Sequence, residues 1–129
     1  MTSEEMKIRT KRFALRVLKL VESLPYGKSA DVIGKQLLRC GTSVGANYRA
    51  ACRAKSTADF IAKLAIVEEE ADESIYWIEL LVESSLVKEN LVINLLDEAN
   101  QILSIVVSAI KTSKEKRNPK SQVPNPKSL

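Results

Sequence analysis

The chain has 129 residues, of which 45% are hydrophobic and 28% charged, the composition of an ordinary globular domain. It contains no histidine, which removes the commonest general base and the commonest transition-metal ligand. Only 4 glycines and 4 prolines occur, and three of the prolines lie in the last eleven residues, so helix breakers are scarce in the body of the chain. We therefore expect one all-α domain that is not an enzyme and needs no cofactor or metal.

Charge is distributed unevenly along the chain. The formal net charge is +4, but residues 1–27 carry +3, residues 28–63 carry +5, residues 64–110 carry −9 and residues 111–129 carry +5. A chain polarised in this way can complement copies of itself, or present a basic surface to a polyanion. A third alternative is that the charged faces neutralise one another within a single bundle.

Compartment is indicated by two negative features and by the cysteines. No segment approaches the ~20 consecutive apolar residues of a membrane span, and the charged N-terminus lacks the apolar run of a signal peptide. Cys40 and Cys52 lie on one predicted helix at a distance of roughly 18 Å, which is too far for a disulfide. Two free thiols favour the reducing cytoplasm. The lack of an apolar span predicts a protein without membrane contacts.

Apolar spacing of three and four residues predicts four helices. They are expected at Glu4–Leu24, from Ser29 onward, from Ser56 or Thr57 to about Val82, and from near Lys88 to about Lys114. Short connections between helices favour an up-down-up-down four-helix bundle over residues 1–114. The remaining residues, 115–129, are polar, basic and proline-bearing, which predicts a disordered basic C-terminal tail.

The second predicted helix combines glycines with a basic face. Gly34, Gly41 and Gly45 each cost about 1 kcal/mol in a helix interior relative to alanine, so we expect another helix to approach closely there. The basic residues form the candidate nucleic-acid-binding set, Lys35, Arg39, Arg49, Arg53 and Lys55. Such a set can follow a phosphate backbone. Pairing with the acidic third helix of a neighbouring copy and plain solvation remain the alternatives.

The third predicted helix is apolar on two sides. Besides its core stripe it carries a second strip, from which the candidate oligomer interface is taken: Ile66, Tyr76, Trp77 and Leu80. A helix with two apolar sides has two surfaces to pack against, and aromatic residues anchor interfaces. The second surface is then either another subunit or, for Trp77, a neighbouring helix of its own bundle.

Four segments together resemble a known family. They are residues 43–51 (SVGANYRAA), 55–64 (KSTADFIAKL), 68–74 (EEEADES) and 76–81 (YWIELL). They resemble the bacterial four helix bundle protein family, also called the 23S rRNA intervening-sequence protein family because some members are encoded within insertions in large-subunit rRNA genes. The resemblance covers about Met6 to Lys114. The chain departs from the commoner pattern at residues 48–51, where many members carry Ile-Ala-Glu-Gly.

The resemblance implies a ring-like homopentamer of four-helix subunits in the bacterial cytoplasm, without enzymatic activity. A related branch comprises the accessory variability determinant proteins of diversity-generating retroelements, which bind a reverse transcriptase and nucleic acid. The sequence therefore supports two hypotheses. One is a self-assembling bundle that binds RNA or DNA through its basic face. The other is a structural or docking module whose charged faces serve only contacts with other subunits or with a partner protein, such as a reverse transcriptase.

Overall fold

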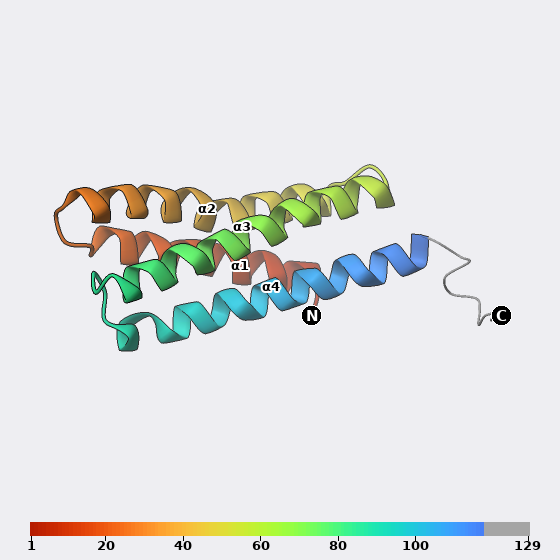
Figure 1. Cartoon of the computed structure of the whole chain (residues 1–129). Coiled ribbons are helices and arrows are strands. Elements are labelled where there is room, and N and C mark those ends of the chain that lie inside the picture. The colour runs from red at the N-terminus through yellow and green to blue at the C-terminus, as the bar shows by residue number, and fades with distance from the viewer. Residues whose placement is uncertain (118–129) are drawn as a thin grey trace.

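Four long helices make up nearly all of the described chain. The computed structural model describes residues 1–117 and contains no strand within them. The helices are α1 (Ser3–Glu22), α2 (Lys28–Cys52), α3 (Thr57–Glu83) and α4 (Glu89–Arg117). Successive helices run in opposite directions (Figure 1). The prediction of an all-α, up-down-up-down four-helix bundle is confirmed.

Three sides of the bundle are closed and the fourth is largely open. The pairs α1–α2, α2–α3 and α3–α4 pack along their lengths, whereas α1 and α4 contact one another over a short stretch only. Arg9 of α1 ties that stretch to α4, because its guanidinium donates to Glu98 at 2.6 and 2.9 Å and to Gln101 at 2.6 Å. The hydrogen bonds to Glu98 raise the pKa of Arg9.

The helices also differ in length, which leaves one tip of the bundle with three helices. α1 has 20 residues and α4 has 29, a difference of about 13 Å at 1.5 Å rise per residue. Figure 1 shows the N-terminal end of α1 beside the middle of α4, while α4 continues toward the α2–α3 turn. α4 reaches Arg117, three residues past the predicted boundary at Lys114. The rest of the predicted disordered tail lies outside the described residues.

Side-chain caps define two of the helix starts. Thr2 and Glu5 form a reciprocal capping box at α1, in which each side chain accepts the backbone N–H of the other residue. At α3 the Ser56 hydroxyl accepts the N–H of Asp59 at 3.0 Å, as its spacing predicts. The Asp59 carboxylate accepts the N–H of Lys55 at 3.1 Å. The box at α3 is therefore shifted by one residue.

The start of α2 near Ser29 suggests that residue as a good N-cap, and the structure shows that this prediction is wrong. Ser29 lies inside the first turn, and the residue before the helix is Gly27, which makes no side-chain cap. Gly27 has a φ of +146°, a backbone conformation that residues other than glycine rarely adopt. The chain reverses direction directly after Pro25, and only glycine permits the reversal at that point.

The helical glycines mark where α1 lies closest to α2. A Cβ added at Gly41 would stand 2.8 and 2.9 Å from the two methyl groups of Val17, and one at Gly45 would stand 3.2 Å from the Thr10 hydroxyl. A Cβ at Gly34 would meet Leu24 at 3.2 Å. The expected close approach of another helix is therefore present, and it is tightest at Gly41.

We predict that Gly41→Ala destabilises the protein by up to about 2 kcal/mol, because overpacking costs about 1–3 kcal/mol while alanine returns about 1 kcal/mol of helix propensity. The matched control is Gly34→Ala, where the nearest atom belongs to the flexible end of Leu24. That variant should be neutral or slightly stabilised. Urea unfolding followed by circular dichroism measures both. Equal effects at the two positions would contradict the role assigned to the Val17 contact.

Candidate nucleic-acid and assembly surfaces

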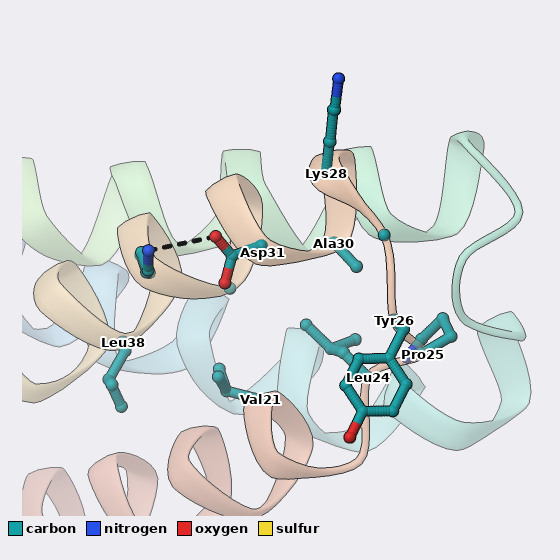
Figure 2. A pocket seen from close by; sticks show the side chains of 11 residues that line it. Val21, Leu24, Pro25, Tyr26, Lys28, Ala30, Asp31 and Leu38 are labelled. Atoms are coloured by element: carbon teal, nitrogen blue, oxygen red, sulfur yellow. Dashed lines mark ion pairs between the residues drawn. The ribbon is translucent and has the colours of Figure 1, made fainter.

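The structure divides the predicted basic set among three places along α2 and the α2–α3 loop. Lys35 lies near the α1–α2 turn, where its ammonium stands 3.1 Å from the Asp31 carboxylate. This ion pair lies in the wall of a pocket (Figure 2), which has a volume of about 470 Å³ and is also lined by Tyr26. Both partners are exposed, and exposed pairs of this kind contribute little to stability. Lys35 therefore lies far along α2 from the other end of the predicted face.

Arg39 is engaged with α3 of its own chain. Its Nη2 donates to Glu73 at 2.8 Å and its Nη1 lies 3.1 Å from Glu70. The Glu70 oxygen makes no hydrogen bond of good geometry, so that second contact is electrostatic. The Trp77 indole N–H donates to the same Glu73 carboxylate at 3.1 Å. Neutralisation within one bundle is therefore what the structure shows for Arg39, and this arginine is poorly placed to bind a phosphate.

Glu73, the carboxylate that Arg39 and Trp77 share, has a lowered pKa. The hydrogen bond from Trp77, followed by that from Arg39, lowers the pKa of Glu73, and the hydrogen bond to Glu73 raises the pKa of Arg39. Both shifts favour the charged pair at neutral pH. We call Arg39, Glu70, Glu73 and Trp77 the α2–α3 clamp.

The other basic residues gather at the three-helix tip. Arg49, Arg53 and Lys55 are exposed, and none of them has a carboxylate within 4.0 Å in residues 1–117. Lys55 and Lys116 line one pocket, which brings the α2–α3 loop and the last turn of α4 together. We call the following residues the basic end: Arg49, Arg53, Lys55, Lys114, Lys116 and Arg117.

One ion pair lies beside the basic end. Lys63 donates to Asp59 at 2.6 Å, and this hydrogen bond, followed by that from the Lys55 N–H, lowers the pKa of Asp59. The Asp59 carboxylate is thereby held at the start of its own helix, where it forms an ion pair with Lys63, and the nearby charge of Lys55 also lowers its pKa. Sequence reasoning noted the cations at the end of the fourth helix but not that Lys116 lies beside Lys55.

The predicted assembly residues divide into exposed and half-buried pairs. Ile66 and Tyr76 are 41% and 56% exposed. Trp77 and Leu80 are half-buried and pack against the core of their own bundle. The rings of Tyr76 and Trp77 meet edge to face with centroids 5.0 Å apart. Trp77 thus covers a helix of its own chain, while Ile66 and Tyr76 face outward. A role of the four in assembly stays a prediction.

The thiols and the motif asparagine lie in local networks. Both cysteines are free; Cys40 is buried and Cys52 half-buried. Burial raises the pKa of Cys40, and burial, with Cys52 nearby, raises the pKa of Tyr48 to about 12. The Asn47 amide donates to the Ser43 carbonyl at 2.9 Å. Asn47 therefore bonds the backbone of its own helix.

The described residues offer no cluster of metal ligands and one helix of membrane-spanning length. Over residues 1–117, no three acidic or cysteine side chains are grouped closely enough to hold a metal ion. Of the described helices, only α4 is long and apolar enough to cross a bilayer by length and composition, with a mean hydropathy of 1.3 in its most apolar 18 residues. Its buried stripe nevertheless packs in the bundle core.

We predict that the α2–α3 clamp opens in acid. A carboxylate whose pKa is lowered on folding contributes stability that is fully present above its unfolded value of 4.5 and is lost as the pH falls through the lowered folded value. Trp77 is the single tryptophan, so its emission should change in that range, below pH 4.5. Glu73→Gln should abolish the transition, and Glu69→Gln, one turn away and exposed, should leave it. An unchanged transition in Glu73→Gln would contradict the assignment.

Comparison with known proteins agrees with this fold. Residues 4–108 match the family model described as 23S rRNA-intervening sequence protein. A crystal structure of a protein of unknown function from the S23 ribosomal protein family of Bacteroides thetaiotaomicron is 37% identical, with a TM-score of 0.79, covering 86% of this chain and 99% of that one. No significant match was found among curated proteins. The family match extends over most of the chain and includes all four helices, so the chain belongs to the 23S rRNA-intervening sequence protein family.

Proposed function

We propose that the protein is a non-enzymatic, self-assembling helical bundle that binds RNA or DNA through its basic end. The observation that carries the proposal is the gathering of exposed cations at the three-helix tip, where Lys55 and Lys116 line a common pocket and Arg49, Arg53 and Lys55 form no ion pair within residues 1–117. Phosphate backbones are bound mainly by such cations, with release of counterions. The free thiols are in keeping with the cytoplasmic location that the proposal includes.

The structure narrows the face expected from the sequence. Arg39 is held by Glu70 and Glu73, and Lys35 lies at the other end of α2, near the α1–α2 turn. The proposed site therefore keeps Arg49, Arg53 and Lys55 from the predicted set and adds the last turn of α4. Phe60 lines the same pocket as Lys55 and Lys116 but packs against the core of the bundle, so binding should follow charge and shape more than base stacking.

We expect the triple variant Arg49→Ala/Arg53→Ala/Lys55→Ala to bind RNA and DNA more weakly. Each phosphate that the variant no longer neutralises should flatten the dependence of log K on log salt by about 0.9 for duplex DNA and about 0.7 for single strands. Filter binding at several salt concentrations measures both quantities. The control is Lys28→Ala/Lys35→Ala, which removes two cations at the other end of α2 and should leave affinity and slope nearly unchanged. Wild-type protein that fails to bind at low salt, or binds without a salt slope, would remove the nucleic-acid part of the proposal.

A docking module without nucleic acid is the second candidate, and the outer face of α3 favours it. Exposed Ile66 and Tyr76 lie there among carboxylates. In this candidate the charged faces serve contacts with other subunits or with a protein such as a reverse transcriptase. The same filter-binding titration separates the two, because a docking module assembles but shows no salt-dependent affinity for RNA or DNA.

The self-assembly part of the proposal predicts a solution mass well above that of one chain, and five times 14.3 kDa if the ring implied by the family resemblance forms. Tyr76→Ala should weaken assembly by about 1–3 kcal/mol, the loss of an aromatic interface anchor. Val32→Ala is the control, because Val32 is 58% exposed on a different helix and should leave the mass unchanged. Light scattering over a dilution series measures these effects. A monomer at all concentrations would contradict the assembly.

A further inference from the structure

The open side of the bundle holds a groove with an apolar interior and basic surroundings. The groove lies between the second half of α1 and the first half of α4 and has a volume of about 610 Å³. Its lining includes Leu20, Leu91 and Leu95 together with Arg16, Lys19 and Lys88, and contains no acidic side chain. We call it the α1/α4 groove. The three cations have no carboxylate within 4.0 Å in the described part of the chain.

The helix that forms one wall of this groove is apolar but poorly covered. The most apolar 18 residues of α4 have a mean hydropathy of 1.3, yet only 28% of them are buried. Leu91, at the groove, is 73% exposed. Exposed apolar surface of this extent, surrounded by charged residues, indicates an interaction site. The short contact between α1 and α4 explains why the chain does not cover it alone.

The complementary surface lies on the outside of α3. At about 100° per residue, six side chains fall within an arc of about 100° on this helix: Glu69, Asp72, Tyr76, Glu79, Leu80 and Glu83. All are exposed except Leu80, which is half-buried. Tyr76 and Leu80 stand one turn apart, with carboxylates on the flank. We call this set the acidic ridge, and it contains no cation.

We propose that the acidic ridge of one copy of the chain lies in the α1/α4 groove of the next copy. The inference rests on the self-assembly proposed above and names the two surfaces that make it. Tyr76 and Leu80 would contact Leu91 and neighbouring apolar side chains, while the ridge carboxylates face the three groove cations. Opposite charges placed this way select partner and register.

The geometry of one chain excludes pairing with itself. α3 makes no contact with α1 in the described residues, and the ridge faces outward from α3, so a chain cannot place its own ridge in its own groove. The contact therefore joins two different surfaces of two copies. Such a heterologous contact adds subunits head to tail and yields a closed ring or an open filament.

Charge reversal on full-length protein tests the pairing. Arg16→Glu/Lys19→Glu in the groove and Glu79→Lys/Glu83→Lys on the ridge should each raise the dissociation concentration about tenfold or more, as sedimentation velocity measures it. All four residues are exposed, so circular dichroism and thermal unfolding should stay near wild type. All four changes in one chain should restore assembly to within about threefold. Leu15→Ser is the control, because Leu15 is 53% exposed on α1 but does not line the groove.

Mixing the two reversed variants gives a second, independent readout. The ridge of each variant is complementary in charge to the groove of the other, so an equimolar mixture should assemble with the two variants alternating, although each variant alone stays dissociated in sedimentation velocity.

The pairing is overturned if both variants assemble as wild type does, if the combined variant stays dissociated, or if Leu15→Ser alone dissociates the assembly. Binding to phosphatidylglycerol vesicles that Leu91→Ser abolishes, with no change of size in solution, overturns it in favour of a membrane. A wild-type monomer would instead defeat the self-assembly proposal itself, so the two failures are distinguishable.

Discussion

The close approach of α1 to α2 governs the shape of this bundle. Where Gly41 and Gly45 present no side chain, Val17 and Thr10 lie almost against the α2 backbone. Because α1 lies so near to α2, more room is left on the other side of α1, between α1 and α4. Arg9 reaches across that space to Glu98 with a long, forked side chain, where an apolar contact would have required the helices to be nearer. The tight side and the open side of the bundle are therefore two aspects of one arrangement.

The polarised charge of the chain divides into two parts in three dimensions. One part is neutralised inside the molecule, where Arg39 meets the acidic stretch of α3 and Arg9 meets Glu98. The other part lies at the three-helix tip and along the α1/α4 groove, where Arg49, Arg53 and Lys55, and Arg16, Lys19 and Lys88, form no ion pair within residues 1–117. Net charge per segment does not distinguish these parts, because the distinction depends on which faces the packing turns toward one another. The two remaining basic surfaces lie at opposite ends of the bundle, so they are available to different partners.

Much of the fold follows from the sequence because it depends on local spacing. The apolar stripes repeat at the period of an α-helix, and Ser56 with Asp59 marks the start of α3 in the way its spacing indicates. The start of α2 was not predictable from the serine at position 29, because the backbone conformation of Gly27 ends the turn earlier. Similarly, the continuation of α4 to Arg117 depends on packing beside the α2–α3 loop. The signal missed there is that the cations that suit a helix C-terminus continue past Lys114, to Lys116 and Arg117.

The candidate surfaces were less predictable, and the reason is the long range of the contacts. A helical wheel places Lys35, Arg39, Arg49 and Arg53 on one face, but it does not show that Glu70 and Glu73, more than thirty positions later, occupy Arg39. Nor does it show how far two helices that are not consecutive in sequence stand apart. The groove between α1 and α4 depends on that separation. Only three-dimensional packing reveals it.

The unequal lengths of α1 and α4 have a consequence for valency. In a closed ring all subunits are related by rotation about one axis, so the projecting tips of the three longer helices occupy equivalent positions at equal heights. Under the proposed function, a single tip would offer a few weak phosphate contacts, but a polymer that touches one tip would find the others at high local concentration. Long nucleic acids would then be retained far better than short fragments of the same sequence.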